Sequence, residues 1–359
     1  MMSRTEPTEN ETGMGDDRRP LATLRIVEFE GIGPGPLAGR MLADLGARVT
    51  AIVRPVPSPL AKEIGGAAEN PLRAGKTIVG IDLKTAEGLA QARELIRRAD
   101  ALIEGNRPGV MERLGLGPAD CAAFNPRLIY ARMTGWGQDG PLARAAGHDL
   151  NYVALTGLLS LVSRPGVSPI VPPTVMGDVA GAFGLCFGLV SAALDARISG
   201  RGRVVDAAIV DIVAMLGMIV QWGRADGQID GPAPSVFHDS PFYDSYGCAD
   251  GGFITIGATE PQFHALLLDQ LSLTDIDPGA QYDRATWPVL KQRLATLFAS
   301  RPRAHWAGLL EGSDACFAPV LSIDEAVKHP HNKARGIYRR TDAGAVQTRA
   351  APRFSALGP

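Results

Sequence analysis

A strand, a glycine-rich turn, a helix and a second strand follow one another early in the chain, and this order constrains the fold most. LRIVEFE is predicted as a strand, GIGPGP as a turn, LAGRMLADLG as a helix ending at Gly46, and ARVTAIVRP as the next strand. The order returns in KTIVGIDL, a helix over 85–99 and ADALIEGN, and RLIYARMTGWG adds a further strand. Because parallel strands need such crossovers, the sequence predicts an α/β fold with an open, largely parallel sheet.

The pattern changes in the second half of the chain. Long apolar helices are predicted over 178–199 and 205–222, on either side of the turn SGRGR. After Ala225 the residues Gly, Pro, Ser and Asp become frequent, as in a crossing between domains. GGFITIGA is predicted as a hairpin strand, and helices over 260–271 and 284–300 indicate a smaller α+β unit. We therefore predict a disordered tail over 1–20, a large domain over 21–203 and 331–359, a linker helix over 204–228, and a small domain over 229–330.

Charge and cysteine spacing limit the partners. The net charge is -2, so no broad cationic surface is expected for nucleic acid or anionic membranes. The four cysteines are far apart and form no CxxC pair, which indicates reduced thiols in a cytoplasmic protein rather than a disulfide framework or zinc knuckle. The longest apolar run, over 179–194, is shorter than the roughly 20 residues that span a bilayer, so a buried helix is predicted there. We expect a small-molecule partner.

Several common site motifs are absent, which narrows the chemistry. The turn after the first strand fits only the looser GxGxxA form, from Gly33 to Ala38, and the second strand ends in Arg54 instead of a ribose-binding acid. Nicotinamide binding is therefore disfavoured, whereas an arginine at this strand end suits a phosphate. Asn70 stands where a P-loop needs its first glycine, and neither GxSxG nor HExxH occurs. Hydrolase and metalloenzyme interpretations lack a site, and no metal is expected.

Three titratable residues in separate segments remain as candidates. His148 lies where a loop enters a helix, and its alternative role is capping or packing. Asp178 opens the long apolar helix, where an Asp often serves as the N-cap. Glu260 lies between a strand and a helix that has Pro early in its first turn, and it could simply be a solvated first-turn acid.

Ten motifs occur in an order typical of one family: VEFEGIGPGPLA, GKTIVGIDLK, NRPGVMERLGLGP, LIYARMTGWGQDGP, AGHDLNY, GDVAGA, GRGRVVDAAIVD, FYDSY, ADGGFITIGATEPQF and SDACFAPVL. With these motifs the chain resembles the α-methylacyl-CoA racemases of the family III CoA-transferase superfamily, from about Leu21 to Phe354. The resemblance implies a Rossmann-like large domain that holds CoA and a smaller α+β domain inserted late in the chain. It also implies an interlocked homodimer with each active site shared between the two subunits.

The resemblance also implies roles for individual residues. His148 and Asp178 would move the α-proton of a 2-methyl-branched acyl-CoA, with Glu260 of the second subunit orienting the histidine. The backbone N–H of Asp149 is our candidate donor to the enolate oxygen, although its side chain could instead cap its own helix. No separate cofactor is expected, since coenzyme A is part of the substrate, and the context would be the metabolism of branched-chain fatty acids. The expected CoA-binding residues are Arg54, Arg113, Gly31, Ile32, Gly33 and Pro34.

Departures from the family pattern leave other functions open. Leu72-Arg73-Ala74 precede Gly75 where the family usually has Asn-Arg, His238-Asp239-Ser240-Pro241 replace a glycine-rich run near the acyl pocket, and Gly247 replaces a larger polar residue. One alternative is a family III CoA-transferase in which Asp178 attacks the acyl-CoA as a nucleophile. The other is a non-catalytic acyl-CoA-binding protein.

Overall fold

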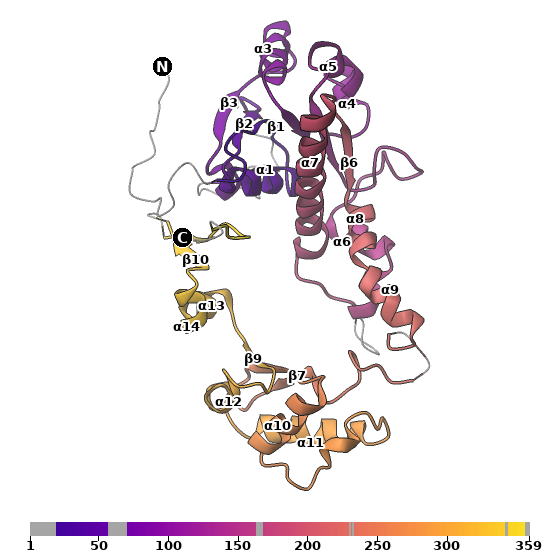
Figure 1. Cartoon of the computed structure of the whole chain (residues 1–359), viewed down its shortest axis with the longest axis vertical. Coiled ribbons are helices and arrows are strands. Elements are labelled where there is room, and N and C mark those ends of the chain that lie inside the picture. Colours follow the sequence, from indigo (N-terminus) through magenta and orange to yellow (C-terminus); the bar gives the residue numbers. More distant parts are fainter. Residues whose placement is uncertain are drawn as a thin grey trace. The chain divides into compact units, whose positions relative to one another are not determined.

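The chain divides into two compact units, which are described separately (Figure 1). The computed structural model describes residues 19–56, 70–162, 168–229, 231, 233–341 and 344–355, so residues 1–18 of the predicted tail lie outside it. The first unit comprises Met1–Leu216 with Ala350–Pro359, and the second comprises Gly217–Arg349. These limits differ from the predicted ones in two places. The division falls between two helices at 216/217, and residues 331–349 group with the second unit.

The first unit is built on a six-stranded sheet in which all neighbouring strands are parallel. The strand order is β3-β2-β1-β4-β5-β6, so the order reverses between β1 and β4 and creates a switch point where α/β folds commonly bind ligands. The α/β class predicted from the sequence is confirmed. The strands are β1 (Arg25–Phe29), β2 (Arg48–Val53), β3 (Thr77–Gly80), β4 (Ala101–Glu104), β5 (Ile129–Thr134) and β6 (Val204–Ala208).

Helices cover both faces of this sheet. Successive strand residues point to opposite faces: Ile26 joins the core under α1 and α7, whereas its neighbour Val27 joins the core under α3 and α5. Leu185 of α7 and Ile96 of α3 are completely buried, one on each side. The helices are α1 (Pro34–Asp44), α3 (Ala86–Arg97), α4 (Val110–Arg113), α5 (Pro118–Phe124), α6 (Asp149–Leu155), α7 (Ala180–Ser199) and α8 (Ile209–Leu216), with short turns at Pro71–Arg73 and Leu158–Val162.

The predicted helix over 205–222 is wrong at its start. Val204–Ala208 form β6, which pairs with β5 in the register Tyr130↔Val204. The β-branched pair Val204-Val205 suits a strand, and the open edge of β5 supplies its hydrogen-bond partners. Helix begins only at Ile209 and is divided into α8 and α9 (Met218–Ala225).

Helix α7 also differs from its prediction. It begins at Ala180 and follows a π-helical turn over Val175–Val179, so Asp178 lies before the α-helix rather than at its first residue. One face is buried, but Phe187 is 73% exposed and Ile198 is 82% exposed. Among the described residues, Val175–Ser199 is the helical segment whose length and composition would suffice to cross a membrane, and 33% of its apolar window is buried.

The second unit has its own small sheet and core. β7 (Tyr243–Gly247), β8 (Phe253–Gly257) and β9 (Phe317–Val320) form an antiparallel sheet, and β7 with β8 is the hairpin expected from GGFITIGA. Leu267 and Phe298 pack on this sheet from two helices. The remaining elements are α10 (Pro261–Gln270), α11 (Trp287–Ala299), α12 (Arg303–Leu310), α13 (Ile323–Lys328), α14 (Pro330–Ala334), β10 (Tyr338–Arg340), β11 (Val346–Thr348) and a short turn at Pro278–Ala280.

Candidate active site

The glycine-rich turn of the candidate site lies at the carboxyl end of β1. The turn over 31–33 follows β1 and leads into α1, next to the switch point between β1 and β4. Gly33 has φ +79 and ψ -125, a backbone conformation that glycine adopts far more readily than other residues. A Cβ added there would lie 3.2 Å from Asp178 Oδ2, so the turn lies directly against that carboxylate. Gly33 thus borders one of the two predicted proton-transfer groups, whereas a Cβ on Gly31 would have nothing within 4 Å.

Two ion pairs hold the residues on either side of this turn: Lys76 with Glu28, and Arg73 with Glu30. Lys76 and Glu28, each with a side chain 1% exposed, are paired at 2.6 Å, and Lys76 Nζ also donates to the carbonyl of Pro36 at 2.8 Å. Burial, opposed by Lys76, raises the pKa of Glu28 to about 7. Arg73, one of the family departures, donates to both carboxylate oxygens of Glu30 at 2.6 and 2.8 Å. Arg73 therefore anchors Glu30, the residue that precedes the turn.

Asp178 has the electrostatic environment of a group that exchanges protons near neutral pH. Burial, and secondarily the charge of Asp149, raises its pKa to about 6, while His148 acts in the opposite direction. The N-cap of its π-turn is Thr174, which has φ 61, so capping is not the role of Asp178. A carboxyl group tuned in this way is suited to acid and base catalysis.

Asp149 holds the backbone of Asp178 in place. Its Oδ2 accepts the N–H groups of both Gly177 and Asp178 at 2.7 Å, and the residue is 7% exposed. A Cβ on Gly177 would lie 2.8 Å from this oxygen, so the close approach requires glycine. The alternative that Asp149 caps its own helix is wrong, because the N-cap of α6 is His148. As the first residue of α6, Asp149 has an N–H without an acceptor within the described part of the chain.

His148 is exposed, which removes the packing alternative. Its side chain makes no capping hydrogen bond, and its backbone N–H donates to Asn151 Oδ1 at 3.0 Å. The sequence analysis missed Tyr152, one helical turn later, whose hydroxyl donates to the carbonyl of Gly147. Burial, with the charge of Asp178, raises the pKa of this hydroxyl. The i,i+4 spacing from His148 could have indicated its proximity.

Glu260 belongs to the second unit. Its exposure is compatible with the alternative role of a solvated acid. It is exposed at the N-cap of α10, and Thr259 Oγ1 donates to its Oε2 at 2.8 Å. Two family departures lie in this unit as well. The loop at 238–241 is held by a hydrogen bond from the Ser235 N–H to Asp239 Oδ2 at 2.7 Å, and Gly247 pairs with Phe253 in the hairpin.

The predicted phosphate-binding arginines are both exposed. Arg54 follows β2, and Arg113 is the last residue of α4. Across the described ranges neither forms an ion pair with a carboxylate, so both guanidinium groups are available to a ligand. The sequence analysis also missed Arg107, an exposed cation after β4 that acts electrostatically on the Tyr152 hydroxyl.

No candidate metal centre accompanies these residues. Over the described residues no group of three or more His, Cys, Asp and Glu side chains has the proximity that a metal ion needs.

Similarity to known proteins covers almost the whole chain. A sequence profile of CoA-transferase family III matches residues 21–357. The chain belongs to CoA-transferase family III. Within this family it is 39% identical to the α-methylacyl-CoA racemase of Mus musculus over 345 residues, which cover 93% of this chain and 86% of that protein. The Homo sapiens racemase is also 39% identical, with coverages of 92% and 86%.

Other relatives share less of the sequence, and one of them has a solved structure with a similar fold. The acetyl-CoA:oxalate CoA-transferase of Acetobacter aceti is 28% identical over 91% of this chain and 87% of its own. The crystal structure of Rv3272 from M. tuberculosis matches with a TM-score of 0.77 at 26% identity, covering 94% of each chain. Because identity to the racemases is higher than to this transferase, the comparisons favour the isomerase within the family.

Proposed function

We propose that this family III protein is an isomerase that inverts the α carbon of 2-methyl-branched acyl-CoA thioesters. The observation that carries the proposal is the Asp178 carboxyl group, which lies against the Gly33 turn, is influenced by His148, and has a pKa of about 6. The 39% identity to racemases points to the same reaction. Asp178 as the nucleophile of a CoA-transferase is the competing function.

The reaction requires a proton to leave one face of a carbon atom and another to arrive on the opposite face. The thioester carbonyl acidifies the α C–H bond, so one group removes that proton as the C–H electrons form an enolate. The second group then donates its own proton to the other face, and the thioester is restored with inverted configuration. His148 and Asp178 exchange these roles according to the enantiomer bound. The pair must hold a single proton between them, and raising the Asp178 pKa from 3.8 to about 6 increases the fraction of its protonated form near neutral pH.

The other predicted residues bind and stabilise the substrate in this proposal. The N–H of Asp149 donates to the enolate oxygen, where one such donor is typically worth about 10²–10³ in turnover. Arg54 and Arg113 contact CoA phosphates, and the turn Gly31, Ile32, Gly33 and Pro34 lies beside the pantetheine arm. Coenzyme A arrives as part of the substrate, so the reaction needs no separate cofactor. A methyl-branched fatty or sterol side chain is the proposed acyl group.

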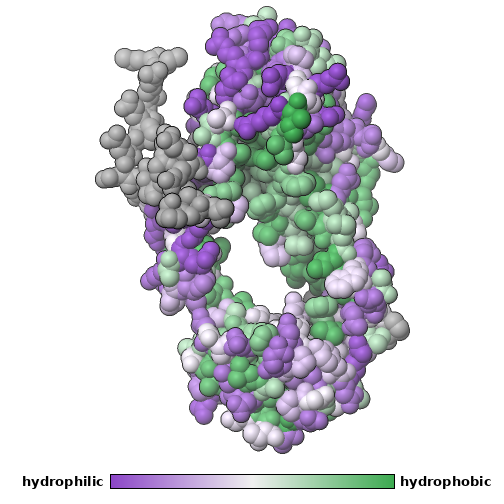
Figure 2. Space-filling view, in the orientation of Figure 1, coloured by the Kyte–Doolittle hydropathy of each residue, from purple (hydrophilic) through white to green (hydrophobic). Residues whose placement is uncertain are grey.

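A second copy of the chain completes the site in this proposal. Figure 2 shows hydrophobic residues gathered over α7, and large exposed apolar surfaces commonly mark protein–protein interfaces. An interlocked homodimer would cover it and would bring Glu260 of the second copy to His148, with the second unit as a small inserted domain. All four cysteines are free thiols, so a cytoplasmic location is part of the proposal. The proposal includes no nucleic-acid partner and no membrane partner. The exposed members of this face are Phe183, Phe187, Val190, Leu194 and Ile198.

Hydrogen exchange at the α carbon tests the proposed reaction. The protein is incubated in deuterated water with (2R)-2-methylacyl-CoA and no carboxylic acid acceptor. We expect deuterium at the α position together with the (2S) product. Deuterium-free transfer of CoA, seen only when a second carboxylic acid is added, would establish the transferase. Tight binding without exchange, unaffected by His148→Ala, would establish a non-catalytic binder.

A further inference from the structure

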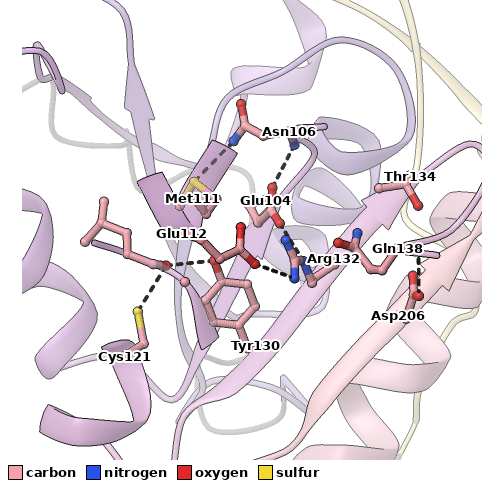
Figure 3. A network of polar contacts seen from close by, with 12 residues as sticks. Glu104, Asn106, Met111, Glu112, Cys121, Tyr130, Arg132, Thr134, Gln138 and Asp206 are labelled. Atoms are coloured by element: carbon pink, nitrogen blue, oxygen red, sulfur yellow. Dashed lines mark hydrogen bonds and ion pairs between the residues drawn. The ribbon is translucent and has the colours of Figure 1, made fainter. Parts of the chain in front are cut away.

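A buried arginine links the centre of the sheet to the predicted phosphate site. Arg132 lies in β5 and is 7% exposed, and its register partner is the completely buried Glu104 at the end of β4. Arg132 Nε donates to Glu104 Oε1 at 3.0 Å, and Arg132 Nη1 pairs with Glu112 Oε1 in α4 at 2.9 Å (Figure 3). One guanidinium therefore joins a strand end to a helix that follows it.

The Glu104 end of this link fixes the turn that leads into α4. Its second oxygen, Oε2, accepts the backbone N–H of Asn106 at 2.7 Å. The Asn106 amide in turn donates to the sulfur of Met111, which is completely buried. The turn after β4 is thus tied to the sheet through Arg132 and Glu104, as the dashed lines in Figure 3 show.

The Glu112 end fixes α4 itself, which needs external support. Four residues are too few for a helix to be stable in isolation. Glu112 is held by Arg132, and the chain beyond α4 is held by Tyr130, whose hydroxyl donates to the carbonyl of Leu116 at 2.8 Å. Two side chains of β5 therefore determine where the last residue of α4, Arg113, is placed.

Arg113 has little else to orient it. Its Nη1 lies 3.2 Å from the position of a Cβ on Gly109, the φ +86 residue at the start of α4, so the guanidinium lies over the first turn. Within the described ranges it has no carboxylate partner. Where its guanidinium can reach is therefore set by the placement of α4 rather than by an ion pair of its own.

We infer that Arg132 is a positioning residue for CoA recognition, and that it acts by fixing α4 so that Arg113 faces the nucleotide phosphates. The inference rests on the proposed function. The two edges of a guanidinium hold Glu104 and Glu112 at once, which the single ammonium of lysine cannot do. A merely structural ion pair would affect stability alone. A positioning residue must instead change affinity for the nucleotide half of the substrate.

Two variants separate positioning from folding. Arg132→Lys keeps a charge beside Glu104 but loses the second edge. Glu112→Ala removes the α4 anchor at a side chain that is 43% exposed, so the buried pair stays intact. The matched control is Glu94→Ala, which removes a glutamate whose side chain is 45% exposed and which pairs with Arg97 and with Arg98 at the end of α3. For each variant we would measure the Kd of coenzyme A, the kcat with saturating acyl-CoA, and the KM for the corresponding acyl-pantetheine, which lacks the nucleotide.

We expect both variants to bind coenzyme A about 3- to 10-fold more weakly, with kcat within twofold of the parent and an unchanged KM for acyl-pantetheine. Glu94→Ala should match the parent. Adding Arg113→Ala to Glu112→Ala should cause no loss beyond that of Arg113→Ala alone. If Arg132→Lys does not fold, Glu112→Ala decides.

Two results would overturn the inference while leaving the proposed function standing. One is parental coenzyme A affinity in both variants while Arg113→Ala binds weakly. The other is an equal loss for acyl-pantetheine, which would indicate general disturbance. If Arg113→Ala itself binds coenzyme A like the parent, the proposed phosphate site is wrong and the positioning role falls with it.

Discussion

Replacing Asp149 by asparagine should lower the pKa of Asp178 and shift the pH profile of the reaction. Both backbone N–H groups held by Asp149 bond to the same oxygen, Oδ2, so the single carbonyl oxygen of an asparagine can accept both. The substitution therefore keeps the hydrogen bonds and removes only the charge. Since that charge is the second cause of the raised pKa of Asp178, after burial, the pKa must fall.

The magnitude follows from the environment of Asp178. Its pKa rises from 3.8 to about 6, and burial contributes more than Asp149 does. Asp149 is therefore the smaller of the two upward contributions, and solvent screening at this partly exposed group leaves it a shift of about 0.5–1 pH unit. The acid limb of kcat/KM, where Asp178 takes up a second proton for the pair, should move to lower pH by that amount.

The assay is the pH dependence of kcat/KM for racemisation, measured from pH 4.5 to 9 with the parent, Asp149→Asn and Glu87→Gln. Glu87 is an exposed first-turn residue of α3, so this control removes one charge away from the site. An acid limb that stays in place in Asp149→Asn, or moves to higher pH, would refute the electrostatic reasoning. An equal shift in Glu87→Gln would show that only net charge matters.

Three further substitutions test the geometry. Gly33→Ala should lower kcat at least tenfold and destabilise the fold by about 1–2 kcal/mol, as measured by turnover assays and thermal melts. Gly140 also has a positive φ but has open space around it, so Gly140→Ala should show only the loss of stability. Tyr152→Phe should cost about 1 kcal/mol of unfolding free energy and reduce kcat with little change in KM, because the histidine loop loses its hydroxyl anchor; a normal kcat would contradict that anchor role. Lys76→Met leaves the Glu28 carboxylate buried without its cation and should destabilise the folded protein by about 3–5 kcal/mol in urea unfolding. The double variant that adds Glu28→Gln should recover part of this loss, and no recovery would refute the pairing argument.

The sheet was predictable because its signals are local. Each strand from β1 to β5 is a short apolar run bounded by turn residues, and α1 and α3 each have a helical period and an end signal, whereas the short helices α4 and α5 were not predicted. β6 was missed because its apolar residues run directly into those of α8, and only the edge of β5 decides that Val204–Ala208 pair instead of coiling. The division at 216/217 was likewise hidden within one continuous apolar stretch.

The sequence pointed to candidate residues but not to the contacts between them. Family motifs pointed to His148 and Asp178, which the structure brings into one electrostatic environment. The contact from Asp149 to the Asp178 N–H joins residues 29 positions apart, so no local pattern reveals it. Arg132 had a signal that was not used: a charged residue inside an otherwise apolar strand requires a buried partner.

The central claim is that His148 and Asp178 act on opposite faces of one carbon atom, and exchange by single-base variants tests it most directly. Each enantiomer of 2-methylacyl-CoA is incubated in deuterated water with His148→Asn or Asp178→Asn, and α-deuterium and configuration are measured. We predict that neither variant racemises its substrate, and that each exchanges one enantiomer only, with retention of configuration and with opposite preferences. Exchange of the same enantiomer by both variants, or racemisation by either, would contradict the account.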